Sequence, residues 1–362
     1  MDAANLRLAD YLARAGADVR LVAHRVAPQL LARPGVVWQR VAKPLNSYRL
    51  GAPLLARAGA RADAAGRAAG GRTIANGGNC ATTDTNWVHY VHAAHRPEIA
   101  AGAARRRLEA WTHRRAVGAE RNALRRARFV IANSERTRRD VIERVGVDAA
   151  RVRRVYYGAD PSIHRPPDAA ERAAARAALA WRDERPACVF VGALGDRRKG
   201  FDTLFAAWER LCRDAAWDAR LVVVGAGQEL AAWRARVEGA GLADRIQFTG
   251  FISDVRAVLW AADAVVAPTR YEAYGLGVHE AVCCGLPAIV SEDAGVAERL
   301  GELDALRIRK PDDADDLAAA LWRWRRGTDA WRDRAAPAAA RLRAWTWDDM
   351  ARQIVAEMAE RP

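Results

Sequence analysis

Short runs of consecutive apolar residues recur through the second half of the chain, and each is followed by a stretch with helical spacing. The runs occupy residues 188–192, 221–225, 246–250, 264–268 and 288–290. Strands that are apolar at every position are typical of parallel sheets that helices cover on both faces. The pattern therefore predicts an α/β fold with a doubly wound sheet in this half.

The first half shows a similar but less regular alternation. Strand-like runs lie at 18–23, 36–41, 72–76, 87–92, 129–132 and 152–156, and helical stretches lie at 6–15, 47–70, 105–128 and 135–144. Ser134 is a suitable N-cap for the last of these helices. A proline-rich connector over 161–186 separates the two series. We predict two Rossmann-like domains, 1–165 and 166–344, and a C-terminal helix over 345–362 that can pack on the first domain.

Positive charge is concentrated in the first half of the chain. Residues 1–160 hold 29 Lys and Arg against 13 Asp and Glu, a net charge of +16, whereas residues 161–362 carry −2. Three interpretations remain open. The arginines can simply solvate helix surfaces, they can meet an anionic membrane or an acidic acceptor, or they can bind nucleic acid. Nucleic acid is disfavoured, because few aromatic residues lie among the basic clusters and no nucleic-acid-binding motif is present.

The remaining composition narrows the class of protein. No apolar run reaches the length of about 18 residues expected of a membrane span, and the first residues do not resemble a signal peptide. The five cysteines show neither metal-ligand spacing nor a disulfide framework. We therefore expect free thiols and a cytoplasmic protein, with a peripheral position at the inner face of the membrane as a further expectation.

The most informative segment runs from Tyr271 to Pro287. Glu272 and Glu280 are eight positions apart, with a small-residue loop between them, in an order that predicts strand, loop, helix and strand. Such a loop places backbone N–H groups at a helix N-terminus, which favours an anion. Both carboxylates could then address one polyhydroxyl ligand whose phosphates rest on the loop. The simpler interpretation is a helix N-terminal charge and an ordinary surface glutamate.

With these residues the chain resembles the family 4 glycosyltransferases, retaining enzymes of the GT-B fold, in which two Rossmann-like domains face each other across a cleft. The pair Glu272 and Glu280 matches their hallmark. Further matching segments are Val191-Gly192, Arg198-Lys199-Gly200-Phe201-Asp202, Val224-Gly225-Ala226-Gly227, Phe248-Thr249-Gly250, Ala294-Gly295 with Glu298, Ala132-Asn133-Ser134-Glu135, Tyr157-Gly158-Ala159-Asp160 and Trp345-Thr346-Trp347. The resemblance covers nearly the whole chain and is densest from 188 to 300.

The resemblance implies a nucleoside-diphosphate-sugar as donor substrate, no other cofactor and no metal. Lys199 would bind the diphosphate, Glu280 the ribose hydroxyls and Glu272 the transferred sugar. The remaining donor-site candidates are Arg198, Gly192, Gly225, Tyr274, Gly275 and Leu276. The leaving diphosphate carries about two negative charges, which cations and helix N-termini can stabilise.

The resemblance also implies front-face attack with retention of configuration, assisted by the leaving phosphate. His92 resembles the acceptor-domain histidine that contacts the donor sugar, and His95 is its rival. If 87–92 is a strand, His89 and His92 lie on opposite faces and do not act together. A buried structural histidine is the simpler interpretation. The acceptor is expected to be a glycan or a lipid-linked hydroxyl.

Two departures from the family pattern bear on activity. Ala193 stands where the family usually has an arginine, so Arg197 or Arg198 would have to supply that phosphate-binding cation. The family also opens with a strand and a glycine-rich loop, whereas this chain begins with the equivalent of the first helix. We therefore expect an N-terminal domain that lacks its first strand, either because Met1 is not the true start or because part of the cleft is missing.

Two other functions compete with sugar transfer. A truncated relative could bind a sugar nucleotide or a glycan without turnover. A dinucleotide-dependent oxidoreductase is less well supported, because Gly225 and Gly227 are not followed by the third glycine of the dinucleotide-binding motif.

Overall fold

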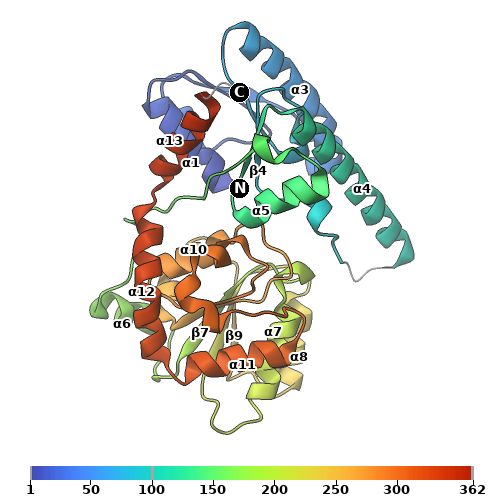
Figure 1. Ribbon diagram of the computed structural model, residues 1–362. Coiled ribbons are helices and arrows are strands. Elements are labelled where there is room, and N and C mark those ends of the chain that lie inside the picture. Colours follow the sequence, from blue (N-terminus) through green and yellow to red (C-terminus); the bar gives the residue numbers. More distant parts are fainter. Residues whose placement is uncertain (1, 99–101, 360–362) are drawn as a thin grey trace. The chain divides into compact units, whose positions relative to one another are not determined.

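The computed structural model describes residues 2–98 and 102–359. The chain divides into two compact units (Figure 1). The first unit contains residues up to Arg96, residues up to Gly158 and the segment from Thr346 onward, and the second contains Ala159–Trp345 with the short segment that begins at Pro97. The division thus lies at 158/159 and 345/346, where the sequence predicts 165/166 and 344/345. Ala159 belongs to the second unit because its N–H donates to the Trp345 carbonyl.

The second unit is built on one parallel sheet of five strands in the order β11-β10-β7-β8-β9. The strands are β7 (Ala187–Val191), β8 (Arg220–Val224), β9 (Ile246–Gly250), β10 (Ala264–Ala267) and β11 (Ala288–Val290). The helices are α6 (Ala169–Ala178), α7 (Phe201–Leu211), α8 (Leu230–Gly239), α9 (Arg256–Ala261), α10 (Leu276–Cys283), α11 (Ala314–Arg325) and α12 (Thr328–Ala344). All five apolar runs predicted as strands in this half are confirmed.

The core of this sheet explains why its strands are apolar at every position. Strands β7, β8, β10 and β11 are buried along almost their whole length. Parallel strands need crossover helices, and these cover both faces of the sheet, so no strand face is left for polar side chains.

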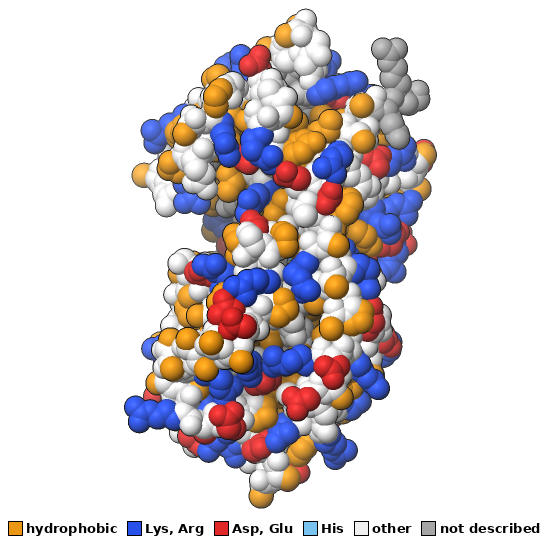
Figure 2. Space-filling model, turned by 90° about the vertical axis from the view of Figure 1, so that its left-hand side faces the viewer, with side chains coloured by type: hydrophobic (Ala, Val, Ile, Leu, Met, Phe, Trp, Pro, Cys, Tyr) orange, Lys and Arg blue, Asp and Glu red, His pale blue; other side chains and the backbone are white. Residues whose placement is uncertain are grey.

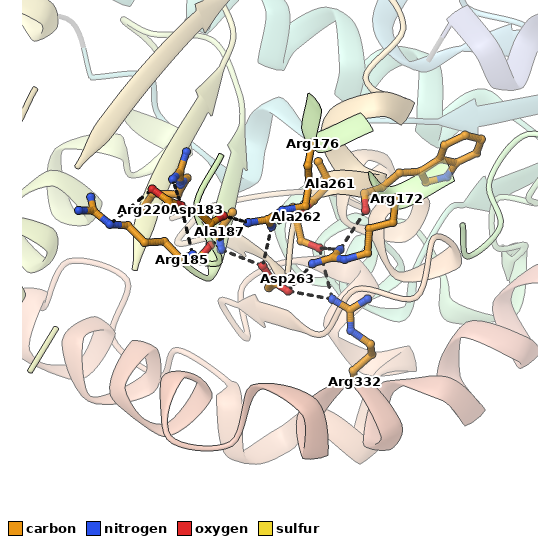
Figure 3. A network of polar contacts seen from close by, with 11 residues as sticks. Arg172, Arg176, Asp183, Arg185, Ala187, Arg220, Ala261, Ala262, Asp263 and Arg332 are labelled. Atoms are coloured by element: carbon orange, nitrogen blue, oxygen red, sulfur yellow. Dashed lines mark hydrogen bonds and ion pairs between the residues drawn. The ribbon is translucent and has the colours of Figure 1, made fainter. Parts of the chain in front are cut away.

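A buried carboxylate joins the amino end of β10 to two helices (Figure 3). Asp263, just before β10, is 8% exposed. Its oxygens accept from Arg172 of α6 at 2.8 Å, from Arg332 of α12 at 3.0 Å and from the Ala187 N–H at 2.9 Å. Arg176 donates to the neighbouring Ala261 carbonyl at 3.2 Å. Removing one partner of such a buried ion pair leaves uncompensated charge, so we expect this contact to be important for stability.

The first unit contains two separate parallel sheets among the described residues. One pairs β1 (Val19–Ala23) with β2 (Val36–Arg40), and the other has the order β3-β4-β5-β6. Its strands are β3 (Ile74–Asn76), β4 (Thr85–Val88), β5 (Phe129–Ala132) and β6 (Val152–Arg154). The helices are α1 (Asp2–Arg14), α2 (Pro28–Leu31), α3 (Tyr48–Ala68), α4 (Ala103–Arg126), α5 (Glu135–Asp140) and α13 (Trp347–Ala359).

The sheet of the first unit is divided among the described residues, and the absence of a first strand stays a prediction. Strands β4 and β5 are fully buried, whereas every residue of β1 and β2 is at least partly exposed. Strand β1 pairs only with β2, and β3 only with β4, among the described residues. Two-stranded sheets are marginal by themselves, so the packing of α1 and α3 against β1 contributes to holding this part together.

Two predicted elements end earlier than expected. The strand predicted over 87–92 is wrong beyond Val88, because its partner β5 ends where Val88 pairs with Ala132. The buried carboxylate of Glu120 then accepts from the N–H groups of His92 and Ala93 at 2.8 and 3.0 Å, and a 3₁₀ turn begins there. The opposite-face expectation for His89 and His92 therefore does not apply.

The α-helix predicted over 135–144 gives way to a π-helical turn after Asp140. That turn ends at Gly146, which adopts a left-handed conformation with φ of 78°. The predicted cap is confirmed, since the Ser134 hydroxyl accepts from the Thr137 N–H at 2.9 Å. The C-terminal helix α13 packs against α1, with an ion pair of 2.6 Å between Arg14 and Asp348.

Within residues 2–98 and 102–359, no helix combines the length and the apolar composition needed to cross a bilayer.

Candidate active site

Glu272 lies in the loop that leaves the carboxyl end of β10. Its N–H donates to the Asp293 carbonyl at 3.2 Å, and its own carbonyl accepts from the Gly295 N–H at 3.0 Å. The segment before α10 is therefore held against the segment that follows β11. In open α/β sheets this edge, beyond the carboxyl ends of the strands, is where ligands bind.

Two cations meet the Glu272 carboxylate. The Lys199 Nζ lies 2.5 Å and the Arg198 Nη1 lies 3.1 Å from the same oxygen, Oε2. Arg198 is fixed further by donating to the Tyr271 carbonyl at 3.0 Å and to Asp196 at 3.0 Å. Burial acts to raise the pKa of Glu272, but the charges and hydrogen bonds of Lys199 and Arg198 outweigh it and hold that pKa below its usual value. The carboxylate is ionised, and it keeps two cations at the loop.

The loops after β7 and β8 bring backbone to backbone beside these cations. The Gly192 N–H donates to the Val224 carbonyl at 3.0 Å. A Cβ on Gly225, which has φ of 152°, would lie 1.9 Å from the Gly192 carbonyl oxygen. Any side chain at 225 would therefore push the two loops apart. A Cβ on Gly192 would lie 2.8 Å from the Phe190 ring and 3.5 Å from the Lys199 Cγ, so Gly192 leaves room for both side chains.

Gly275 forms the N-terminal boundary of α10. Its φ of 102° is accessible to glycine but rarely to other residues. Leu276 and Gly277 follow as the first helical residues and remain partly exposed between buried neighbours. The first N–H groups of a helix have no partner within the helix and carry its positive dipole end. The predicted anion-binding geometry is therefore present at 275–277.

Tyr274 contributes its backbone to this loop, whereas its side chain points into the core. The Tyr274 side chain is 2% exposed, and its hydroxyl lies 2.6 Å from the His279 Nδ1 and 3.2 Å from the Arg299 Nη1 that donates to it. Burial raises the pKa of Tyr274 to about 12 and lowers that of His279 to about 3, so both groups are neutral. The three side chains fix the loop to α10 and to the segment after β11.

Glu280 lies on the same face of α10 as Leu276 and Gly277, at the spacing of one helical turn. Burial raises the pKa of Glu280 to about 7. The His164 Nε2 lies 4.0 Å from its Oε1. A carboxyl in this position offers two acceptor oxygens to a ligand and exists near neutral pH as a mixture of its two protonation states.

The structure indicates which arginine can compensate for Ala193. Arg198 reaches Glu272, whereas Arg197 pairs with Asp202 at 3.0 Å and lies 3.8 Å from Glu98. Arg198 is therefore the better candidate for the second phosphate-binding cation.

His92 lies in the first unit, at the start of the 3₁₀ turn that follows β4. Its ring is 5.0 Å from that of Tyr90, and burial, aided by the charge of His113, lowers its pKa. His89, three residues earlier, has two polar partners. Its ring nitrogens contact the Tyr157 hydroxyl and, at 3.0 Å, the Asn76 Oδ1, and burial lowers its pKa to about 3. The role of His92 at a donor sugar stays a prediction.

Sequence reasoning missed three side chains of this region. They are His164 beside Glu280, and His279 and Arg299 behind Tyr274. No local pattern marks His164, which is more than a hundred residues away from Glu280 in the chain. His279 was visible as the residue before Glu280, and its burial on the inner face of a short apolar helix could have been inferred.

Two models of known families match the chain. Residues 4–163 match the model described as "Glycosyltransferase Family 4" and residues 185–325 match the model "Glycosyl transferases group 1". The chain belongs to glycosyltransferase family 4. The connector lies between the two matches, and both agree with the resemblance inferred from Glu272, Glu280 and their companions.

Curated relatives of this family 4 chain match parts of it. A GDP-mannose-dependent alpha-(1-6)-phosphatidylinositol dimannoside mannosyltransferase of Mycobacterium tuberculosis is 43% identical over 28% of this chain and 26% of its own length. A D-inositol 3-phosphate glycosyltransferase of Rhodococcus opacus is 34% identical over 49% and 41%. A 2-deoxystreptamine glucosyltransferase of Streptomyces kanamyceticus is 30% identical over 64% and 58%. The chain thus spans between about a quarter and three fifths of these relatives.

Solved structures show that this family 4 chain has the GT-B fold. Sucrose-phosphate synthase of Thermosynechococcus elongatus superposes with a TM-score of 0.77 at 23% identity, covering 97% of this chain and 90% of its own. Anabaena HepE in complex with UDP and glucose gives 0.71 at 20% identity, covering 99% and 96%.

Proposed function

We propose that the protein is a retaining glycosyltransferase that moves a sugar from a nucleoside-diphosphate-sugar to a hydroxyl acceptor in polysaccharide or glycolipid biosynthesis. The observation that carries this proposal is the contact of Lys199 and Arg198 with Glu272, beside the N-terminus of α10. A diphosphate needs cations and backbone donors, and a sugar needs a carboxylate acceptor. All three lie together on one edge of the sheet in the second unit.

The ion pairs suggest how the donor is accepted. Lys199 and Arg198 neutralise Glu272 while the diphosphate is absent. A bound diphosphate, with two negative charges, competes for the same cations and draws them toward the phosphates. Glu272 is then released from its ion pairs, and its oxygens can accept hydrogen bonds from the hydroxyls of the sugar. Glu280, on the partly exposed face of α10, would accept from the ribose.

Retention by front-face attack is part of the proposal. In this route the diphosphate oxygen that leaves the sugar carbon takes the proton of the attacking hydroxyl, and the protein stabilises the charge that builds on the phosphates. Lys199, Arg198 and the N–H groups at 275–277 are placed for that task. The chemistry needs no metal, and this also stays a prediction.

The acceptor is proposed from the relatives. One is named for a phosphatidylinositol dimannoside, a lipid, and two others for D-inositol 3-phosphate and 2-deoxystreptamine, both small polyols or amines. We propose a glycan or lipid-linked hydroxyl, met at the first unit, whose arginines suit an anionic partner. The same reasoning proposes a protein that works on the cytoplasmic side of a membrane, as a peripheral protein and without a nucleic-acid partner.

Sugar release from UDP- and GDP-linked donors, followed by detection of the free nucleoside diphosphate, tests this function. The Lys199→Ala and Glu272→Gln variants are expected to lose at least about a hundredfold in rate, as is usual when a group that stabilises transition-state charge is removed. Lys310→Ala and Glu302→Gln, on exposed side chains of the same unit, are the matched controls and should retain the wild-type rate. Unchanged rates in both site variants would overturn the assignment.

A second candidate function has one observation in its favour. The divided sheet of the first unit leaves open the binding of a sugar nucleotide without turnover. Calorimetry with UDP and GDP, run beside the turnover assay, separates the two candidates. Binding by a folded protein that releases no product from any donor and acceptor pair favours the binding function.

A further inference from the structure

The outward face of α4 has an unusual composition. This helix (Ala103–Arg126) buries Glu120, Ala123 and Leu124. At 100° per residue, the direction opposite these buried residues is that of Trp111. Trp111 is 47% exposed, and Leu108, one turn earlier on the same face, is 46% exposed. Large apolar side chains therefore lie at the centre of the solvent-facing side of a long helix.

The charges around Trp111 are all positive. Every arginine of α4 is exposed, namely Arg105, Arg106, Arg107, Arg114, Arg115, Arg121, Arg125 and Arg126. Arg115 lies over the Trp111 ring, 4.8 Å from its centroid. The two carboxylates of α4 point elsewhere, because Glu120 is buried and Glu109 pairs with Arg49 of α3 at 2.7 Å. The outward face of α4 thus combines an aromatic centre with a ring of guanidinium groups and carries no carboxylate.

A second group of exposed apolar side chains lies at the start of α3 and in the turn before it. Leu45 is 92% exposed and Tyr48 is 72% exposed, and Leu50 and Leu54 are 48% and 37% exposed. The ion pair between Arg49 and Glu109 links this segment to α4. Six of the ten large hydrophobic side chains that are exposed in residues 2–98 and 102–359 lie here. We call this set the basic–apolar face: Leu45, Tyr48, Leu50, Leu54, Leu108 and Trp111 with the exposed arginines of α4.

The backbone conformation at Leu45 favours a functional role for this exposed side chain. Leu45 and Asn46 have φ of 50° and 52°, a left-handed conformation that costs energy in residues other than glycine. An apolar side chain is thus held outward by a strained turn, at a position where a polar residue or a glycine would be cheaper. Strain of this kind is concentrated at functional surfaces.

Both helices of the basic–apolar face follow strands of the first unit in the chain. Helix α3 begins after the carboxyl end of β2, and α4 begins after the carboxyl end of β4. The strands are parallel within each of the two sheets, so each helix follows the carboxyl end of a strand in its own sheet. In parallel sheets this is the end at which ligands bind.

We propose that the basic–apolar face docks on an anionic membrane surface. Aromatic and aliphatic side chains inside a ring of arginines are what an anionic lipid interface accepts, because the apolar groups enter the acyl boundary while the guanidinium groups pair with headgroups. The face commits to lipid because four exposed aliphatic side chains are of no use against a phosphodiester backbone. This inference extends the proposed function, since it places a lipid-linked acceptor at the first unit.

Vesicle sedimentation tests the docking without any sugar nucleotide, so its result is independent of turnover. The full-length protein is mixed with vesicles of phosphatidylcholine alone or with phosphatidylglycerol added. The wild-type protein is expected to sediment with the anionic vesicles only. The triple variant Arg107→Gln, Arg114→Gln, Arg115→Gln should bind them about a hundredfold more weakly, since each basic side chain contributes about fivefold.

A second variant isolates the apolar part of the face. The double variant Leu108→Gln, Trp111→Gln retains every arginine and should bind at least about tenfold more weakly. This loss should persist at high salt, because salt does not screen the burial of apolar side chains. Glutamine keeps the helix, since its helix propensity is close to that of arginine and leucine. Circular dichroism confirms that α4 is still folded in both variants.

Matched controls remove the same groups from the second unit. The triple variant Arg182→Gln, Arg213→Gln, Arg234→Gln removes an equal charge from exposed positions, and Phe251→Gln removes a side chain that is 78% exposed. Both should bind anionic vesicles like the wild type.

The docking proposal is overturned if the wild type ignores anionic vesicles, if it binds neutral vesicles equally, or if the control triple variant loses as much affinity as the α4 triple variant. Retention of the protein by duplex DNA at physiological salt, with no vesicle binding, would assign the face to nucleic acid and overturn it as well. Vesicle binding together with absent sugar turnover would support the docking and contradict only the proposed function.

Discussion

The parallel sheets of the two units differ in how completely their strands are buried. The second unit has one five-stranded sheet with four strands buried along almost their whole length, and its Asp and Glu side chains lie among its Lys and Arg side chains on the face shown in the lower part of Figure 2. The first unit has a divided sheet, partly exposed strands β1 and β2, and all of the chain's excess positive charge.

The difference in packing corresponds to the different structural requirements of the candidate donor site and of the basic–apolar face. The candidate donor site depends on fixed distances between Lys199, Arg198 and Glu272, and a rigid, fully covered sheet provides them. The basic–apolar face of the first unit depends on exposed side chains, and these are compatible with looser packing. The comparison teaches that a precise polar site requires a well-packed sheet beneath it, whereas a docking surface does not.

The largest expected effect concerns the buried carboxylates at the base of the two sheets. Asp263→Ala in the second unit should lower the free energy of unfolding by about 3–5 kcal/mol, because Arg172 and Arg332 lose their shared partner. Asp84, which precedes β4 in the first unit, pairs with Arg128 at 3.3 Å and with the half-exposed Arg72 at 3.7 Å. Asp84→Ala should lower the free energy of unfolding by a smaller amount, because water can solvate the half-exposed Arg72 once its partner is removed. Urea unfolding of both variants measures the difference, and equal losses would break the comparison.

Amide hydrogen exchange sharpens the same comparison without any substitution. The N–H groups of β1 and β2 should exchange at least about a hundredfold faster than those of β7 and β8, because a partly exposed two-stranded sheet opens locally. Strands β4 and β5 of the first unit are the internal control. They are fully buried and should be protected like β7. Equal protection of β1 and β7 would show that the divided sheet is as stable as the continuous one.

A smaller effect is expected from Glu280 and depends on pH. Its pKa is raised from 4.5 to about 7 by burial. The folded protein therefore holds this proton more tightly than the unfolded chain between these values, and its stability falls as the pH rises through them. Glu280→Gln stays neutral, so at pH 8 it should be more stable than the wild type by about 1–3 kcal/mol, whereas near pH 4 the two should agree.

The control for Glu280→Gln has the opposite sign. The hydrogen bond and charge of Arg341 lower the pKa of Glu302, so Glu302→Gln should lose stability at pH 8, by at most about 1 kcal/mol for such an exposed pair. Thermal unfolding of both variants at pH 4 and pH 8 reads the two signs. A Glu280→Gln variant that is less stable than the wild type at pH 8 would contradict the assigned environment of Glu280.

Most of the fold could be predicted from the pattern of apolar residues. The continuous runs at 188–192 and 221–225 correspond to β7 and β8. Such strands are easily recognised in a sequence, because a strand that is buried on both faces has no polar positions. The cap at Ser134 and the loop before α10 were also visible, since their residue types are tied to local backbone geometry.

The parts that could not be predicted depend on contacts between distant segments. Strand β4 ends at Val88, and beyond it the Glu120 carboxylate on α4 accepts hydrogen bonds from the N–H groups of His92 and Ala93. Arg198 and Lys199 reach Glu272 across more than seventy residues of chain, and local sequence offers no signal for that. The same holds for His164 beside Glu280 and for the choice of Arg198 over Arg197.

The affinity of the Glu272→Gln variant for UDP and GDP, measured by calorimetry, tests the central claim most directly. These ligands have a diphosphate but no sugar, so the variant loses no contact with them, and Lys199 and Arg198 are no longer held by a carboxylate. We expect the variant to bind the nucleoside diphosphate at least as tightly as the wild type while its sugar turnover is lost. Weaker binding of UDP and GDP by the folded variant would contradict the claim that these two cations pass from Glu272 to the diphosphate.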